Sequence, residues 1–280
     1  MNRIPLSVLI LTRNEEKLLA RCLRSVAWAD EIVIVDALST DRTKEIALAA
    51  GEPWSGKTRF IERAWKGFRE ARNTSLDEAT HDRVLVIDAD EACTPELRDR
   101  LTSLLSQPGG PPSAAYKIQR LEFFLGKPIR YGIWNPSYQD RFFDRRGVRY
   151  INDVHEYPVF KSPPDLIHEP LEHNPDFGIE RFLEKMNTYT SVEALDRYQK
   201  GKRTNRFHLF FAFPAMFLKN YFYYGAYKDG IHGFVISVLE GISRAVRHVK
   251  IWKIQNERRQ AHQTASTGTP ARQQTTEPAR

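Results

Sequence analysis

Apolar runs of strand length alternate with helical patterns over residues 6–105, and this alternation constrains the fold more than any other feature of the chain. Residues 6–12, 31–36 and 83–88 are continuous runs of mostly aliphatic side chains, which is typical of strands buried in a parallel sheet. Residues 59–62 predict a shorter strand. Strands that alternate with helices form βαβ units, so the sequence predicts an α/β fold with a mostly parallel sheet flanked by helices.

Apolar residues at helical spacing fill the gaps between these strands. Residues 18–26 predict the first helix, with Thr12 or Asn14 as its cap. Residues 39–41 offer a cap for a second helix, which Gly51 would end. Further helices are expected at residues 67–79 and at residues 94–105, the latter with Pro95 in its first turn.

The chain changes character after a break rich in proline and glycine at residues 106–113. Residues 116–124 and 138–150 predict strands that extend the first sheet, with a turn between antiparallel partners at residues 144–147. A polar stretch follows to about Asp176. We therefore assign residues 1–176 to one α/β domain, residues 177–258 to a C-terminal helical region and residues 259–280 to a disordered tail.

The C-terminal region combines aromatic, apolar and basic side chains. A polar helix is predicted at residues 179–199, an aromatic segment follows at 207–227, and residues 231–252 carry an apolar stripe at helical spacing. The opposite face of that last segment is basic, with Arg244, Arg247 and Lys250. A membrane span needs ~20 consecutive apolar residues, and charges interrupt both segments earlier. A helix that lies in the membrane interface fits better, and packing of the stripe on the α/β domain is the alternative.

Charge and cysteine content indicate the partners and the compartment. The net charge is +7, and the segment from Arg244 onward is strongly basic, which predicts an anionic partner. These basic residues lie on an amphipathic helix and are not interleaved with stacking aromatics, so an anionic membrane surface is favoured over nucleic acid. Cys22 and Cys93 make no disulfide framework, and the N-terminal apolar run is interpreted as a strand. We expect a protein of the reducing cytoplasm, peripheral on the inner face of the cytoplasmic membrane.

Carboxylates gather where the predicted parallel strands end. Asp36 closes one strand, and Asp88, Asp90 and Glu91 crowd the end of another. In open α/β sheets, ligands bind beyond the carboxyl ends of the strands, and carboxylates packed this closely repel one another. A divalent cation would remove this repulsion, since Mg²⁺ takes oxygen ligands beside substrate phosphates. The sequence therefore predicts a metal–diphosphate site at this edge, and an acidic loop that starts a helix is the alternative.

The motifs along this edge resemble those of the GT-A inverting glycosyltransferases of family 2 over residues 4–255. Residues 6–16 are similar to that family's opening strand and loop, and residues 29–43 to its second strand and the helix after it. Gly67-Phe68 with Arg72-Asn73 is similar to the segment before its metal-binding Asp-x-Asp. The likeness extends to the subgroup that adds sugars to the lipopolysaccharide inner core, through Trp134, residues 139–143, residues 154–156 and residues 171–173.

This resemblance implies a GT-A (Rossmann-like) enzyme that transfers a sugar with inversion from a nucleoside diphosphate sugar, with uridine as the expected base. The acceptor would be a glycolipid or a lipopolysaccharide-core-type oligosaccharide at the cytoplasmic membrane face. The implied nucleotide-sugar contacts are Thr12, Asn14, Glu15, Asp36, Arg72 and Asp88. Asp90 and Asp88 would hold Mg²⁺ or Mn²⁺, with His155 or His173 as a further ligand.

Inversion at the anomeric carbon needs a general base that takes the proton of the acceptor hydroxyl. The candidates downstream of the metal motif are Glu156, Asp153 and Asp140. We favour Glu156, because it belongs to the His-Glu pair that the resemblance includes.

Residues 37–38 depart from the family pattern, in which a small residue and a glycine follow the second-strand aspartate. Leucine tolerates a positive φ poorly, so with Leu38 in the place of that glycine we expect a loop of different shape. Two other functions stay open. One is a nucleotidyltransferase of similar fold, although residues 12–15 lack its glycine-rich basic loop, and the other is a non-catalytic membrane-binding module.

Overall fold

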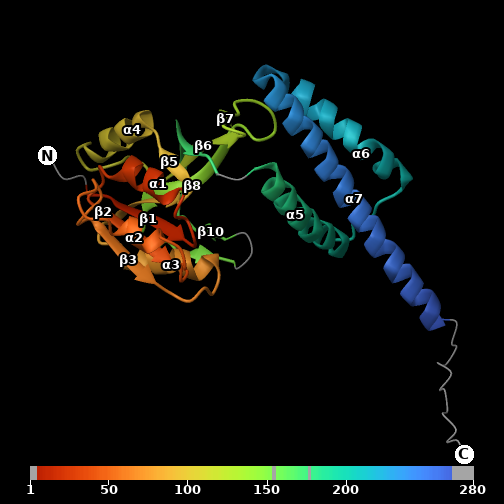
Figure 1. Cartoon of the computed structure of the whole chain (residues 1–280), viewed down its shortest axis with the longest axis horizontal. Coiled ribbons are helices and arrows are strands. Elements are labelled where there is room, and N and C mark those ends of the chain that lie inside the picture. The colour runs from red at the N-terminus through yellow and green to blue at the C-terminus, as the bar shows by residue number, and fades with distance from the viewer. Residues whose placement is uncertain (1–4, 153–155, 176–177, 267–280) are drawn as a thin grey trace, which may run out of the picture. The chain divides into compact units, whose positions relative to one another are not determined.

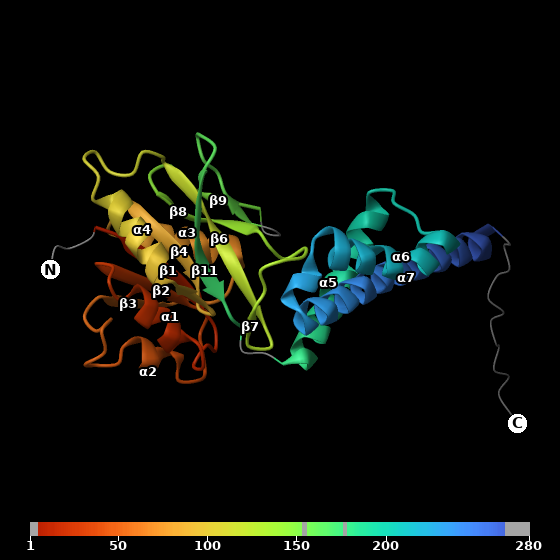
Figure 2. The same cartoon turned by 90° about the horizontal axis from the view of Figure 1, so that it is seen from above.

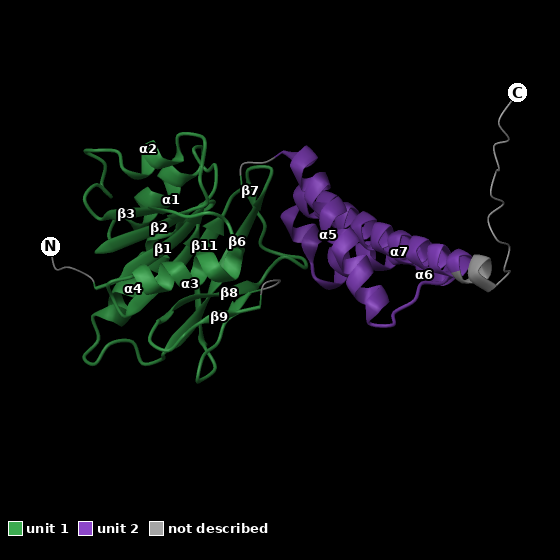
Figure 3. Ribbon diagram, turned by 90° about the horizontal axis from the view of Figure 1, so that it is seen from below, with its two compact units in different colours: residues 1–177 green, residues 178–280 purple. Residues whose placement is uncertain are grey.

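The structure, a computed structural model, describes residues 5–152, 156–175 and 178–266, with side chains as far as residue 261. The chain divides into two compact units, residues 1–177 and residues 178–280 (Figure 1, Figure 3). Each unit has its own packed interior, and each is described separately.

Unit 1 alternates strands and helices as far as α4 and then continues mainly with strands. Its elements are β1 (Ser7–Thr12), α1 (Leu19–Val26), β2 (Glu31–Asp36), α2 (Thr43–Ala47), β3 (Thr58–Glu62), α3 (Phe68–Glu78), β4 (Arg83–Asp88), β5 (Glu91–Cys93), α4 (Pro95–Leu105), β6 (Ala115–Phe124), β7 (Lys127–Pro128), β8 (Ser137–Asp144), β9 (Tyr150–Ile151), β10 (Tyr157–Pro158) and β11 (Asp165–His173).

One mixed sheet forms the centre of unit 1, in the order β3-β2-β1-β4-β8-β6-β11-β5 (Figure 2). The strands from β3 to β4 are all parallel, which confirms the predicted βαβ units. Strand β8 then pairs antiparallel with both β4 and β6, so the later strands extend the first sheet as predicted. Because β1, β2 and β4 run the same way, Thr12, Asp36 and Asp88 end at one edge of the sheet.

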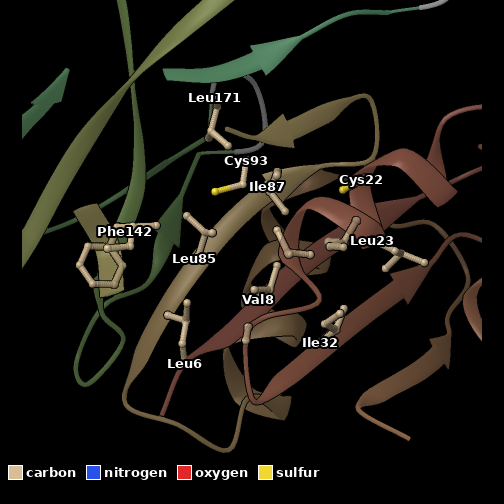
Figure 4. Packing of buried hydrophobic residues seen from close by; sticks show 14 of the residues in the cluster. Leu6, Val8, Cys22, Leu23, Ile32, Leu85, Ile87, Cys93, Phe142 and Leu171 are labelled. Atoms are coloured by element: carbon tan, nitrogen blue, oxygen red, sulfur yellow. The ribbon is translucent and has the colours of Figure 1, made fainter. Parts of the chain in front are cut away.

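The faces of the sheet pack against different helices. Alternate residues of the parallel strands, such as Val8 and Ile32, point into a core that α1, α2 and α4 cover. Figure 4 shows this core, where Leu23 lies against Val8 and Ile32. Their strand neighbours, such as Leu9 and Val33, point to the other face and pack with Leu76 of α3. Both faces are therefore buried, which explains why these strands are apolar throughout.

Two sequence predictions fail in the second half of unit 1. No turn at residues 144–147 joins antiparallel partners, because β8 pairs with β4 and β6 while β9 pairs with β10. The polar stretch before Asp176 contains β11, which lies inside the sheet between β6 and β5. Only Ile167 and Leu171 of β11 are fully buried, and the register shifts between them near Pro170. That irregularity removes the alternating pattern by which a strand is recognised.

The first helix lacks the predicted cap, and the second helix ends earlier than predicted. Helix α1 begins at Leu19 without a side-chain cap, so neither Thr12 nor Asn14 caps it. Helix α2 ends at Ala47, before Gly51. The cap at α4 is as expected, since the Thr94 hydroxyl accepts a hydrogen bond from the backbone N–H of Leu97 at 3.2 Å.

Glu31 joins three segments at the sheet edge opposite to the strand ends described above. Its carboxylate accepts hydrogen bonds from the hydroxyl of Ser7 and from the backbone N–H and hydroxyl of Thr80, the latter two at 2.7 Å. Arg59 adds an ion pair at 3.3 Å. Burial alone raises the pKa of Glu31, but the hydrogen bonds outweigh it and lower the pKa. The charged form is therefore the stabilised one.

Glu31→Gln should lower the free energy of unfolding by about 1–2 kcal/mol at neutral pH, because an amide accepts these bonds more weakly than a carboxylate. A lowered pKa gives stability that is present above the unfolded-state pKa and is lost as the pH falls through the folded-state pKa. Urea unfolding should therefore show the gap between the two proteins closing below about pH 4. Glu62→Gln on β3, an exposed partner of Lys44, should cost less than about 0.5 kcal/mol. A gap that is constant into acid would contradict this role of Glu31.

Unit 2 is helical. It contains α5 (Ile179–Gln199), α6 (Arg206–Leu218), a π-helix (Lys219–Tyr223), a 3₁₀-helix (Ala226–Asp229) and α7 (Ile231–Ser266). Helix α7 packs along both α5 and α6 (Figure 3). Gly233 permits a close approach, since a Cβ there would lie 1.8 Å from the Ala226 carbonyl oxygen. No helix in the described ranges is both long and apolar enough to cross a membrane.

Two expectations for α7 are wrong. The helix continues to Ser266, so residues 259–266 of the predicted tail are helical, while residues 267–280 lie outside the described residues. The basic face also turns inward. Arg247 is buried and ion-paired with Glu193, and Lys250 donates hydrogen bonds to Asn187 and Thr190 of α5. These side chains hold the helices together and are not presented as a charged surface.

Candidate active site

The ends of β1 and β2 are joined by a network of short hydrogen bonds. The Thr12 hydroxyl donates to Asp36 Oδ1 at 2.7 Å, and the backbone N–H of Ser39 donates to Asp36 Oδ2 at 2.7 Å. The Asn14 side chain accepts from the backbone N–H of Thr40 at 2.8 Å, and the backbone N–H of Glu15 donates to the Thr43 hydroxyl at 2.8 Å. The predicted residues Thr12, Asn14, Glu15 and Asp36 thus share one rigid loop pair.

Asp36 also lines a small pocket between the end of β2 and the start of α3. Arg63, Trp65 and Lys66 line the same pocket. Two cations and an indole beside a buried carboxylate make a surface suited to an aromatic base and an anionic group. The sequence patterns did not single out these three residues, because residues 63–67 form an irregular connection with no periodicity.

Leu38 adopts φ 55°, so the premise that leucine would avoid a positive φ at this position is wrong. A left-handed conformation costs a leucine about 1–2 kcal/mol. The turn nonetheless forms, because the two Ser39 hydrogen bonds to Asp36 close it. The leucine side chain is 55% exposed and directly follows Ala37, which lines the pocket beside Asp36.

Two arginines neutralise the carboxylates at the end of β4. Arg141 of β8 contacts Asp88 at 2.5 Å and Glu91 at 2.7 Å, and Arg72 of α3 pairs with the other oxygen of Asp88. Glu91 is fully buried, and its second oxygen accepts the backbone N–H of Asp88 at 3.0 Å. Guanidinium groups therefore neutralise Asp88 and Glu91, and the expectation that their repulsion requires a divalent metal cation is wrong for these two residues.

The pKa values of this cluster follow from burial and charge. Burial raises the pKa of Asp88, but the guanidinium groups of Arg141 and Arg72 outweigh it and hold the pKa far below its ordinary value. For the deeper Glu91, burial dominates and the pKa is raised. Asp88 is consequently negatively charged at neutral pH, and its two carboxylate oxygens are already paired with Arg72 and Arg141.

Asp90 belongs to a different group, which β11 and β6 complete. His173 Nε2 lies 3.2 Å from Asp90 Oδ2, and His173 Nδ1 is hydrogen-bonded to Glu122. Arg120 pairs with Glu122 at 2.6 Å. Burial lowers the pKa of His173, but the bonds to Asp90 and Glu122 outweigh it and raise the pKa to about 9. Of the two histidines considered as ligands, the structure brings His173 to the site, whereas His155 lies outside the described residues.

The donor set around Asp90 suits a divalent cation only together with further ligands. A carboxylate on Nδ1 with Nε2 turned to the site is the usual support of a ligating histidine. In the described part of the chain, however, no three His, Cys, Asp or Glu side chains form a group that could hold a metal ion unaided. Mg²⁺ is commonly bound by one or two protein groups plus substrate phosphates and water. Asp90 and His173 would therefore suit a metal whose other ligands came from a diphosphate, provided that the metal displaces the proton of His173 Nε2.

Of the three base candidates, two can be placed. Asp140 on β8 is partly buried, its Oδ1 has no hydrogen-bond partner among the described residues, and its Oδ2 lies 3.7 Å from Lys117 Nζ. Burial raises its pKa. Glu156 is half-buried just before β10. Asp153 lies outside the described residues.

Comparison with known proteins finds glycosyltransferases among the relatives of this chain. An uncharacterized glycosyltransferase of Rickettsia prowazekii (strain Madrid E) is 29% identical over 259 residues, which cover 88% of this chain and 86% of that protein. The lipopolysaccharide core biosynthesis glycosyltransferase LpsC of Rhizobium meliloti (strain 1021) is 28% identical over 265 residues, covering 90% and 93%. Among solved structures, S. aureus TarS 1–349 has 17% identity, a TM-score of 0.40 and 91% coverage of each chain.

The family comparison covers the part of the chain that builds the site. The family model described as glycosyl transferase family 2 matches residues 7–159, which is more than half of the chain and includes β1 to β10. Both sheet-edge groups, at Asp36 and at Asp88–Asp90, fall in this range. The chain belongs to glycosyl transferase family 2 and is a glycosyltransferase of that family.

Proposed function

We propose that this glycosyltransferase moves a sugar, with inversion, from a nucleoside diphosphate sugar to a glycolipid or lipopolysaccharide-core-type acceptor at the cytoplasmic face of a membrane. The observation that carries the proposal is the convergence of two polar groups on one edge of the sheet. One is the pocket beside Asp36 at the end of β2, and the other is the Asp90–His173 pair beyond β4. A nucleotide sugar needs both, one for its base and one for its diphosphate.

The roles divide according to these contacts. Asp36 with Arg63 and Trp65 would bind the nucleoside, and uridine is the base to test first. Asp88, held in place by Arg72 and Arg141, would orient the donor sugar or ribose. Asp90 and His173 would hold Mg²⁺ or Mn²⁺. When bound, the cation would stabilise the negative charge that develops on the departing nucleoside diphosphate.

The acceptor class rests on the similarity to LpsC, whose name states lipopolysaccharide core biosynthesis and which is covered almost from end to end. A core oligosaccharide is carried on a lipid, so its transferase works beside a membrane surface. The donor sugar is left to experiment.

Two carboxylates of the described residues are candidates for the general base. Glu156 follows from the family resemblance, whereas Asp140 has the raised pKa and the unpartnered oxygen that suit a base. We retain Glu156 as the base, since Asp140 is already drawn toward Lys117. Asp140 would then contribute mainly to the electrostatics of the site.

Sugar transfer itself tests the proposal, with a panel of uridine and other nucleoside diphosphate sugars, Mg²⁺ or Mn²⁺, and delipidated or intact core oligosaccharide as acceptor. The wild-type protein should form a product of inverted anomeric configuration. Glu156→Gln should lower kcat by about 10²–10⁴-fold with little change in the donor KM, and Asp140→Asn should lower it far less. The reverse order would transfer the base role to Asp140, and a product of retained configuration would contradict the proposed mechanism.

A further inference from the structure

Helix α6 and the π-helix after it expose most of their large aromatic side chains and bury a narrow stripe of other residues. The residues they bury are Ala212, Met216 and Asn220, a single narrow stripe at intervals of four residues. Phe213 and Phe217 contact α7, but five other large apolar side chains face the other way. They are Phe207 (65% exposed), Phe210 (76%), Phe211 (52%), Leu218 (52%) and Phe222 (60%). An ordinary surface helix buries its aromatic residues and exposes its polar ones, so this arrangement indicates a surface with a partner.

These five residues, here called the aromatic face, form one continuous side of the segment. Their successive spacings of three, one, seven and four residues keep them on the helix side opposite to Ala212 and Met216. Phe207 and Phe211 stack with ring centroids 4.5 Å apart. Because α6 spans Arg206–Leu218 and a membrane span needs ~20 apolar residues, this side can lie in an interface but cannot cross it.

The segment that carries the aromatic face has charged residues of one sign. Between residues 197 and 228 the chain has no Asp or Glu, and its basic residues are Arg197, Lys200, Lys202, Arg203, Arg206, Lys219 and Lys228. Apolar aromatic side chains flanked by lysine and arginine complement a lipid surface with anionic headgroups. A protein partner would not require so uniform a sign over the whole segment.

A hollow of about 240 Å³ opens beside the aromatic face, between α6 and α7. Phe207, Phe211, Lys219 and Arg244 are among the residues that line it. Among the described residues, Arg244 has no carboxylate within ion-pair distance, and its Nη2 instead contacts Met216 Sδ at 3.7 Å. Lys219 lies over the Tyr224 ring at 5.4 Å. Within the described residues these two cations form no ion pair, although Glu193 and Glu240 attract Arg244 from a longer distance. Cations in a hollow walled by aromatic rings match a phosphate group attached to an acyl chain.

We propose that the aromatic face lies in the interface of an anionic membrane, with its rings among the acyl chains and a lipid phosphate in the hollow beside Lys219 and Arg244. This refines the membrane part of the proposed function and names the surface responsible. Of the three basic residues named for α7 it keeps Arg244, whereas Arg247 and Lys250 bind α5. Vesicle binding is measured without donor or acceptor, so its failure would leave the transfer chemistry untouched.

Co-sedimentation of the full chain with vesicles tests the aromatic face. The protein should bind vesicles of equal parts phosphatidylcholine and phosphatidylglycerol, and Phe210→Ser/Phe222→Ser should bind them at least about tenfold more weakly. Both side chains are exposed, so circular dichroism and thermal unfolding should be unchanged. The matched control is Tyr189→Ser/Leu195→Ser, which removes two exposed apolar side chains from α5 (62% and 50% exposed) and should bind as the wild type does.

A second pair of variants tests the hollow. Lys219→Gln/Arg244→Gln should lose most of the preference for phosphatidylglycerol over pure phosphatidylcholine, whereas Lys253→Gln, an exposed partner of Glu257, should keep it. Wild-type-like binding by the Phe210/Phe222 variant would overturn the proposal. So would a wild-type protein that ignores anionic vesicles, or a self-associated protein that the phenylalanine substitutions dissociate, since a second copy would then cover the face.

Discussion

Arg141→Met should lower the free energy of unfolding by about 3–5 kcal/mol, the usual cost of removing one partner from a buried ion pair. Arg141 contacts both Asp88 and Glu91, and its own side chain is almost fully buried. Glu91 is completely enclosed, so its charge would lose its ion pair with Arg141 at 2.7 Å and keep only the more distant Arg120, 3.9 Å away among the described residues. Asp88 would keep Arg72.

Urea unfolding at neutral pH measures this effect, and the chain offers a matched control. Arg146, just beyond the end of the same strand, pairs with Asp144 and Asp82 but is 68% exposed, and Arg146→Met should cost at most about 1 kcal/mol. Adding Glu91→Gln to Arg141→Met removes the buried charge and should restore a substantial part of the loss. If the two arginine variants unfolded at the same urea concentration, the buried cluster would not contribute in this way.

The parallel half of the site could be predicted from sequence because its geometry follows from a local rule. Strands β1, β2 and β4 each read as an apolar run, and parallel strands end at one edge, so Thr12, Asp36 and Asp88 had to meet. The internal hydrogen bonds of that edge were less predictable. Asp36 is satisfied by Thr12 and Ser39, which depends on the exact turn that Leu38 makes.

The antiparallel half could not be predicted, because strand pairing between segments far apart in the chain leaves no local signal. Arg141 reaches Asp88 only because β8 pairs with β4, and the motif at residues 139–143 was visible as a resemblance without its contact. His173 reaches Asp90 only because β11 enters the sheet. Its proline and charged residues concealed that strand. Glu122 lies on β6, which was predicted, but its contact with His173 also depends on the pairing of β6 with β11.

Asp90→Asn should lower the rate of sugar transfer by about 10²–10³-fold, an effect of the size seen when one charge-stabilising group is removed from a transition state. The substitution keeps the shape of the side chain and its contact with His173 but removes the charge that a cation needs. His173 would keep its bond to Glu122, so the fold should persist with an unchanged thermal midpoint. Asp99→Asn, on the exposed side of α4, is the control for loss of one negative charge and should transfer normally.

The most direct test of the central claim is the affinity of a nucleoside diphosphate for the wild-type and Asp90→Asn proteins, titrated with and without Mg²⁺ or Mn²⁺. If Asp90 and His173 mark the metal–diphosphate position, the cation should tighten binding to the wild-type protein by about 10–100-fold and should leave the affinity of the variant nearly unchanged. Without the cation, both proteins should bind equally weakly, since the pocket beside Asp36 is the same in both. An equal gain from the cation in both proteins would place the diphosphate elsewhere and contradict the account.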